Sequence, residues 1–133
     1  MAELQACPCC SGLAFAHCCE PILTGKCDAL TAQQLMRSRY TAFTQANVDY
    51  LLRSHATNTR PVRERKNIEK WAKSVIWMGL TILKAKAGEA NDGKGYVEFQ
   101  ATFLENGKPG QIHEKSLFYR ENGKWVYVSG VHY

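Results

Sequence analysis

The sequence predicts an α+β protein in which helices pack on one face of a curved antiparallel sheet, preceded by a small cysteine-rich zinc knuckle. Three observations predict this fold. Apolar residues recur at helical spacing in the first half of the chain and alternate along the second half, and five of the six cysteines lie within thirteen positions near the N-terminus. Helices followed by a run of long strands are typical of α+β domains.

Length and composition predict one globular domain with room for a small appendage. The chain has 133 residues, of which 45% are hydrophobic and 22% charged, values that are typical of a protein with a hydrophobic core. The first ten residues, MAELQACPCC, contain neither a basic nor an apolar targeting region, and no run of about 18 apolar residues follows. We therefore expect a cytoplasmic protein that does not bind a membrane.

The stretch CPCCSGLAFAHCC indicates a metal site. Clustered cysteines in a reducing compartment favour metal binding over disulfides. A Cys-x-Cys arm and a Cys-Cys arm lie eight residues apart, and four thiolates converging on one point form a closed tetrahedral zinc site that leaves no position for substrate. The ligands we expect for this one structural zinc ion are Cys7, Cys9, Cys18 and Cys19. Cys10 and His17 are alternative ligands, reduced structural cysteines are the other alternative, and Cys27 is interpreted as a spare thiol.

Three helical segments are expected after the cysteines. The first runs over residues 31–46 and begins with a Thr-x-x-Gln capping box formed by Thr31 and Gln34. Asn47 can cap a second, shorter helix, and a third segment over residues 62–74 follows a proline.

Four strands are expected after residue 74, linked by the turns GEANDG, ENGKPG and ENGK. The last turn contains Asn122-Gly123, the strongest short hairpin signal. Counting back from this hairpin places Glu121 opposite Lys124 and His113 opposite His132. The same count places Glu114 on the half-apolar face of the sheet. We expect no second metal site at the histidines, because the count supplies no third ligand.

The cysteine stretch resembles the SEC-C motif, a small zinc-binding element also found in the SecA translocation ATPase. The pattern of this motif is Cys-x-Cys, then eight residues, then Cys-Cys or Cys-His. The segments LMRSRYTAF and IHEKSLFYRENGKWVYVSG resemble the YchJ family of bacterial proteins. This resemblance implies a zinc-binding element at residues 1–26 and, at residues 27–133, a domain similar to nuclear transport factor 2, whose helices and sheet form a cone around a cavity. The sequence departs from the family at Cys10, where members commonly have glycine, and no second SEC-C motif occurs in these 133 residues.

The implied cone makes pocket chemistry worth considering. Its candidate pocket residues are Arg39 and Tyr40 in the RSRY stretch, together with Glu114. We expect Arg39 and Glu114 to form a polar floor of the cone. The alternatives are a core role for Tyr40 and a purely supporting role for the carboxylate.

The net charge of +5 is concentrated in residues 53–73, which contain seven basic and two acidic residues. Basic segments can bind nucleic acid by releasing counterions from phosphates. The candidate anion-binding residues are Arg60, Arg63, Arg65, Lys66 and Lys70. The alternative is a solvated helix face. Trp71 is the one aromatic residue of the segment, too few for a platform on which bases stack.

Two classes of function remain. In the first, the zinc knuckle is a rigid knob beside the cone that, with the basic segment, docks a protein or ribonucleoprotein such as the ribosome. The SEC-C resemblance favours this class, because the element of SecA docks the SecB chaperone. In the second, the cone pocket binds a small ligand or is an active site, but no activated nucleophile, phosphate loop or open metal site indicates a reaction, so an enzyme is less favoured. Cones of this fold often pair through their sheets, which makes a homodimer a further expectation.

Overall fold

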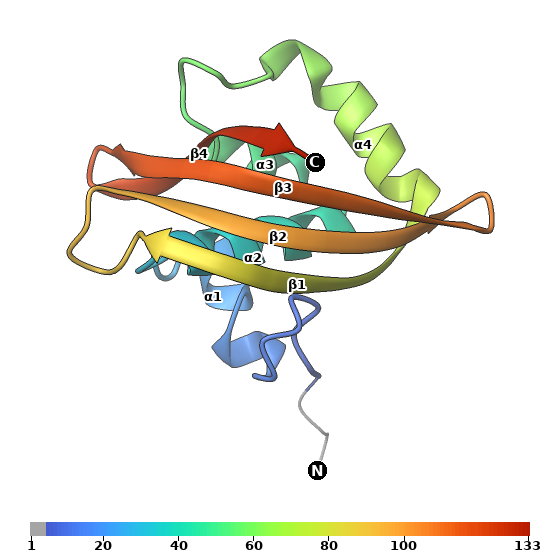
Figure 1. Cartoon of the computed structure of the whole chain (residues 1–133), viewed down its shortest axis with the longest axis horizontal. Coiled ribbons are helices and arrows are strands. Elements are labelled where there is room, and N and C mark those ends of the chain that lie inside the picture. The colour runs from blue at the N-terminus through green and yellow to red at the C-terminus, as the bar shows by residue number, and fades with distance from the viewer. Residues whose placement is uncertain (1–4) are drawn as a thin grey trace.

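The computed structural model describes residues 5–133, in which short helices and turns precede a four-stranded sheet (Figure 1). The helical elements are η1 (Phe15–His17), α1 (Glu20–Leu23), α2 (Ala32–Thr44), α3 (Val48–Arg53), η2 (Val62–Glu64) and α4 (Arg65–Ser74), where η denotes a 3-10 helix. The strands are β1 (Val75–Ala87), β2 (Lys94–Glu105), β3 (Lys108–Glu121) and β4 (Lys124–His132). No helix within residues 5–133 has the length and apolar character needed to cross a bilayer.

Helices α2 and α3 begin where the sequence predicts. The Thr31 hydroxyl accepts a hydrogen bond from the Gln34 amide at 3.1 Å, which caps α2. The Gln34 side chain reaches back to the amide of Leu30 at 2.9 Å, one residue before the position that a standard capping box would bond. The Asn47 side chain accepts from the Tyr50 amide and caps α3 in the predicted way.

The sheet is an antiparallel meander in the order β1-β2-β3-β4. Alternate residues of β2, among them Val97, Phe99 and Ala101, are buried on the face that α2 covers, which we call the inner face. They form one core with α2 residues such as Leu35 and Met36. Figure 1 shows α2 running along this face behind the sheet. The predicted α+β fold is therefore confirmed.

Strand β1 forms one edge of the sheet and contains two β-bulges. Met78 and Leu83 are the extra residues, because the pairing with β2 skips each of them. Both side chains are exposed. The bulges interrupt the regular ladder along this edge.

The last hairpin follows the predicted register only near its turn. The turn at Asn122 pairs Glu121 with Lys124, as predicted. A β-bulge then inserts Val128 as an extra residue in β4. The residues of β3 from Leu117 back to Glu114 therefore pair with β4 residues one position later than predicted. Alternation of side chains does not reveal a bulge of this kind, because the count assumes an unbroken ladder.

The predicted pairing of His113 with His132 is therefore wrong. His132 lies opposite Glu114, and its Nε2 is 3.2 Å from the Glu114 carboxylate. His113 instead contacts the Glu98 carboxylate of β2, 2.7 Å away. Glu114, predicted to lie on the half-apolar face of the sheet, is buried with an exposed fraction of 6%.

The cysteine-rich element is joined to the rest of the protein by a shared core. Cys7, Cys9 and Cys19 are buried in the same hydrophobic cluster as the residues of α2 and β2. The Arg37 side chain of α2 donates to the Cys9 carbonyl oxygen at 2.8 Å. The element is thus packed into the domain, whereas the sequence suggested a knob beside it. The division of the chain at residue 26 stays a prediction.

Replacing Gly130 tests the close packing of β4 against the buried carboxylate. A Cβ atom at Gly130 would overlap the carboxyl group of Glu114, so we expect Gly130→Ala to lower the free energy of unfolding by about 2 kcal/mol. Gly93→Ala is the matched control, because no atom lies within 4 Å of its added Cβ, and we expect a change below about 0.5 kcal/mol. Denaturant unfolding of both variants measures the difference, and equal midpoints would contradict the packing described.

Candidate functional site

Four cysteine sulfur atoms converge at the N-terminal element. The sulfur atoms of Cys7, Cys9, Cys18 and Cys19 all lie within 4.8 Å of one another. Cys18 Sγ is 3.6 Å from Cys9 Sγ and 3.9 Å from Cys19 Sγ, whereas a disulfide bond measures about 2.05 Å. A tetrahedral ion with metal–sulfur bonds of about 2.3 Å requires sulfur–sulfur separations of about 3.8 Å. The four cysteines can therefore hold a metal ion.

Local backbone structure presents these sulfur atoms. The turn after Cys7 closes with a hydrogen bond from the Cys10 amide to the Cys7 carbonyl oxygen, and the Cys7 amide donates to the Leu13 carbonyl oxygen at 2.9 Å. Cys18 and Cys19 lie between η1 and α1, where the chain changes direction. The short loop and the helix junction thus bring the two arms of the motif together.

Crowding of the sulfur atoms changes their acidity. A hydrogen bond with Cys19 lowers the pKa of Cys9 to about 4, and the same hydrogen bond raises the pKa of Cys19. Burial raises the pKa of Cys18. The Cys9 sulfur atom is therefore favoured as a thiolate, whereas the raised pKa values of Cys18 and Cys19 favour their protonated forms.

The other candidate ligands lie outside this cluster. The exposed Cys10 sulfur atom is 3.6 Å from the Pro8 carbonyl oxygen, and His17 and Cys27 are exposed. Cys10 has φ of 65°, a left-handed conformation that glycine adopts without steric cost. This conformation gives a physical reason for the glycine that the resemblance led us to expect there.

A second site is a cavity of about 230 Å³ between α2 and the inner face of the sheet. Its lining includes all three candidate pocket residues, Arg39, Tyr40 and Glu114. Most of the other lining side chains are aromatic or aliphatic and come from α2 and from all four strands. The predicted cone therefore does enclose a space.

The polar floor of this cavity is built around Tyr127. The Tyr127 hydroxyl donates to the Glu114 carboxylate at 2.7 Å, and Ser116 donates to the same oxygen. The Arg39 guanidinium lies over the Tyr127 ring, 4.6 Å from its centroid. The sequence led us to expect Arg39 and Glu114 together, and in the structure Tyr127 links them.

Burial sets the charges of this floor. It lowers the pKa of Arg39 to about 10, against the opposing effects of Tyr127 and Glu114. It also raises the pKa of Tyr127, which therefore stays a hydrogen-bond donor at neutral pH. The floor at neutral pH thus contains a buried cation and a neutral phenol.

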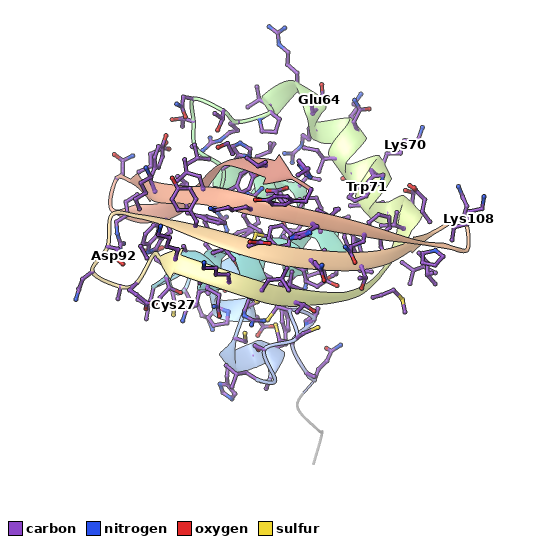
Figure 2. The ribbon with its side chains drawn as sticks, in the orientation of Figure 1. Cys27, Glu64, Lys70, Trp71, Asp92 and Lys108 are labelled. Carbon is purple, nitrogen blue, oxygen red and sulfur yellow. The ribbon has the colours of Figure 1, made fainter. Side chains whose placement is uncertain are left out.

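The candidate anion-binding residues lie on η2, on α4 and in the loop before them. Arg60 donates twice to the His55 carbonyl oxygen, and Arg65 pairs with Asp49. The exposed side chains of Arg63, Lys66 and Lys70 form no ion pair within residues 5–133. Figure 2 labels Lys70 on α4, at the edge of the molecule opposite the cysteine element. Both ends of the basic segment nevertheless reach the cysteine element, because Arg53 donates to the Leu23 carbonyl oxygen and Lys73 lines one hollow with Pro8 and Cys10.

Sequence reasoning missed two residues that position these sites. Arg37 bonds the cysteine loop to α2, and the only signal for it was its place in the RSRY stretch, on a different side of the helix from Arg39. Tyr127 donates to the Glu114 carboxylate, and the bulge at Val128 lies between Tyr127 and the residue opposite Glu114, so a count of residues along the hairpin does not reveal this contact.

Comparison with known proteins matches both parts of the structure. A family model of the SEC-C motif matches residues 5–21, and a model described as the YchJ middle NTF2-like domain matches residues 31–130. The protein is therefore of the class in which a SEC-C motif precedes an NTF2-like domain. Since the second model covers most of the sequence, the chain belongs to the YchJ family. A UPF0225 protein of Pectobacterium carotovorum is 38% identical over 131 residues, covering 96% of this chain and 84% of the relative.

Two solved structures share this architecture at 28% sequence identity. A SEC-C motif containing protein from Rhodopseudomonas palustris superposes with a TM-score of 0.85 over 94% of this chain and 96% of that chain. A SEC-C motif containing protein from Psychrobacter arcticus gives a TM-score of 0.80 over 94% of this chain and 81% of that chain. The arrangement of cysteine element, helices and sheet is thus common to these proteins.

Replacing Cys10 tests the assignment of the four clustered cysteines. We expect Cys10→Gly to keep the metal content of the wild-type protein and to raise the free energy of unfolding by about 1 kcal/mol, because the left-handed conformation no longer involves a side chain. Metal analysis and thermal unfolding measure both effects. Cys27→Ser, at another exposed cysteine, is the control and should change neither. Loss of metal in Cys10→Gly would show that Cys10 is a ligand.

Proposed function

We propose that the four clustered cysteines bind one structural zinc ion and that the zinc knuckle docks a protein partner. The observation that supports zinc is the convergence of four cysteine sulfur atoms within 4.8 Å. Such a set fills a tetrahedral coordination sphere with protein ligands, and zinc is the common ion of closed four-cysteine sites. A closed site holds the shape of the chain and has no coordination position for a substrate.

The surroundings of the cluster support a structural role. Three of the four ligands are buried in the core that α2 and β2 share. A zinc ion with four thiolates carries a net charge of −2, and the Arg37 guanidinium, which donates to the Cys9 carbonyl oxygen, supplies positive charge beside it. The Ser11 hydroxyl lies 3.2 Å from the Cys18 sulfur atom, within reach to donate to a thiolate there. Zinc would thereby fasten the N-terminal loop onto α2.

The surface next to the cluster supports docking. Leu13 and Leu30 are 56% and 63% exposed, and both line a hollow of about 410 Å³. Leu13 lies between the two ligand arms, and its carbonyl oxygen accepts from the Cys7 amide. Zinc would therefore fix the position of an exposed leucine beside a hollow, an arrangement suited to receiving an apolar side chain of a partner.

The exposed basic side chains that form no ion pair within residues 5–133 support binding to a ribonucleoprotein only as a second interaction, in addition to the one at the knuckle. Arg63 lies on η2, Lys66 and Lys70 lie on α4, and Figure 2 shows Lys70 at the edge opposite the knuckle. A partner that engages both regions must span the molecule, as a ribosome can. The protein contact at the knuckle is therefore the primary proposal.

Removing zinc should destabilise the whole domain. We expect the protein as purified to contain one zinc ion, and chelation or Cys7→Ser to lower the free energy of unfolding by several kcal/mol, since the ligands belong to the common core. Elemental analysis and thermal unfolding test this, with Cys27→Ser as the control. An iron content in place of zinc, or a melting temperature that chelation leaves unchanged, would contradict the proposal.

Docking is tested at Leu13 without disturbing the metal. We expect Leu13→Ser to keep one zinc ion and the wild-type stability, because this side chain is exposed, and to lose a partner captured from a lysate of the source cells. Val131→Ser is the control, since Val131 is exposed to a similar degree on β4.

Quantitative mass spectrometry of the captured proteins gives the readout. A partner that binds wild type and Val131→Ser but neither Leu13→Ser nor Cys7→Ser supports docking at the knuckle. Identical capture by wild type and Leu13→Ser would contradict it, and loss of capture after ribonuclease treatment would place the contact on RNA.

A further inference from the structure

The buried guanidinium at the inner cavity has more hydrogen-bond donors than acceptors around it. Arg39 is 6% exposed and lines the cavity. Its Nη1 atom donates to the Leu51 carbonyl oxygen and to Ser54 Oγ, both at 2.7 Å. An arginine side chain has five N–H donors. The three on Nε and Nη2 meet no acceptor among residues 5–133 under ordinary hydrogen-bond geometry.

The Nε and Nη2 atoms that carry these three donors are not fully enclosed by protein. Every fully enclosed side-chain nitrogen or oxygen in residues 5–133 has a hydrogen-bond partner, so the Nε and Nη2 atoms of Arg39 are not fully enclosed. Because Arg39 lines the cavity, we place them at its wall. The Tyr127 ring already covers one face of the guanidinium. The edge formed by Nε and Nη2 is therefore the part that a ligand can contact.

The neighbouring carboxylate does not satisfy this edge. Glu114 accepts from Ser116 and Tyr127 through one oxygen, and His132 contacts the other at 3.2 Å. Both oxygens of Glu114 therefore have partners, while Arg39 has three donors without one. This excess of hydrogen-bond donors favours a ligand that carries hydrogen-bond acceptors. The two oxygens of a planar carboxylate match the two nitrogens along one edge of a guanidinium.

The walls and size of the cavity specify the rest of the ligand. Phe43, Trp77 and Phe99 are among the lining side chains, and their rings present flat apolar surface. A protein cavity of about 150 Å³ binds benzene, so the space of about 230 Å³ has room for a ring with a carboxyl group. Larger carboxylates would extend past the exposed His132 at the rim.

We propose that this cavity binds a small carboxylate with a flat apolar body, whose two oxygens accept hydrogen bonds from Nε and Nη2 of Arg39. The apolar body lies against the aromatic walls between α2 and the sheet. Tyr127 holds the guanidinium plane from one side, and the two bonds of Nη1 fix its orientation. This ligand site shares no residue with the proposed zinc site or with the docking surface at Leu13 and Leu30.

The test uses benzoate as the probe and the zinc-loaded protein. The indole N–H signal of Trp77 reports on the cavity, because Trp77 lines it, and the signal of Trp125, which does not, is the internal control. We expect benzoate to shift the Trp77 signal saturably and to leave Trp125 unchanged. Benzyl alcohol, which has the same ring without the charge, should bind at least about tenfold more weakly, since charge-assisted hydrogen bonds are about twice as strong as neutral ones.

Two variants make the test specific. Arg39→Lys keeps the charge and loses the two-nitrogen edge, so it should weaken benzoate binding at least about tenfold and leave benzyl alcohol binding unchanged. Ala101→Leu adds volume inside the cavity and should abolish both, which keeps the test valid if Arg39→Lys does not fold. A Trp77 signal that benzoate does not shift, or equal affinities for benzoate and benzyl alcohol in the wild-type protein, would overturn the proposal.

Discussion

The packing of α2 against both the cysteine cluster and the inner face of the sheet is the constraint on which the rest of the structure depends. One side of this helix presents Arg37 to the cysteine loop and places Thr41 3.8 Å from the Cys7 sulfur atom. Another side presents Arg39 to the cavity. Because a helix transmits shifts along its length as a rigid body, the order of the cysteine element and the shape of the cavity share one support. A metal in the cluster would therefore steady the cavity wall as well.

The sequence was sufficient for features that depend on local patterns. Capping by Thr31 and Asn47, the alternation along β2 and the spacing of the four cysteines each rest on a few neighbouring residues, and the structure contains all of them. The features that the sequence did not predict depend on tertiary contacts. An extra residue in a strand, such as Val128, carries no compositional mark, so the pairing of His113 came out wrong. The burial of the cysteines in the main core was equally invisible, since hydrophobicity does not indicate which elements face one another.

The polar floor of the cavity shows how a charge is kept inside an apolar layer. Arg39 is stabilised by two carbonyl or hydroxyl acceptors, by the Tyr127 ring and by the more distant charge of Glu114. A direct ion pair would satisfy both partners and close the floor. The intervening phenol leaves the cation partly unsatisfied, which is a cost to stability. Such a cost is common at binding sites, where the missing partner is supplied by a ligand.

The bulges of β1 have a consequence for how copies of this protein meet in a crowded cell. An uninterrupted edge strand offers a template on which another chain can add its own strand, and this is a frequent route to aggregation. Met78 and Leu83 break that template at two points along the edge. If two copies paired through β1, the bulges would prevent a continuous ladder of hydrogen bonds between the two strands. The irregularity of this strand thus disfavours the edge-to-edge strand pairing by which folded proteins commonly aggregate.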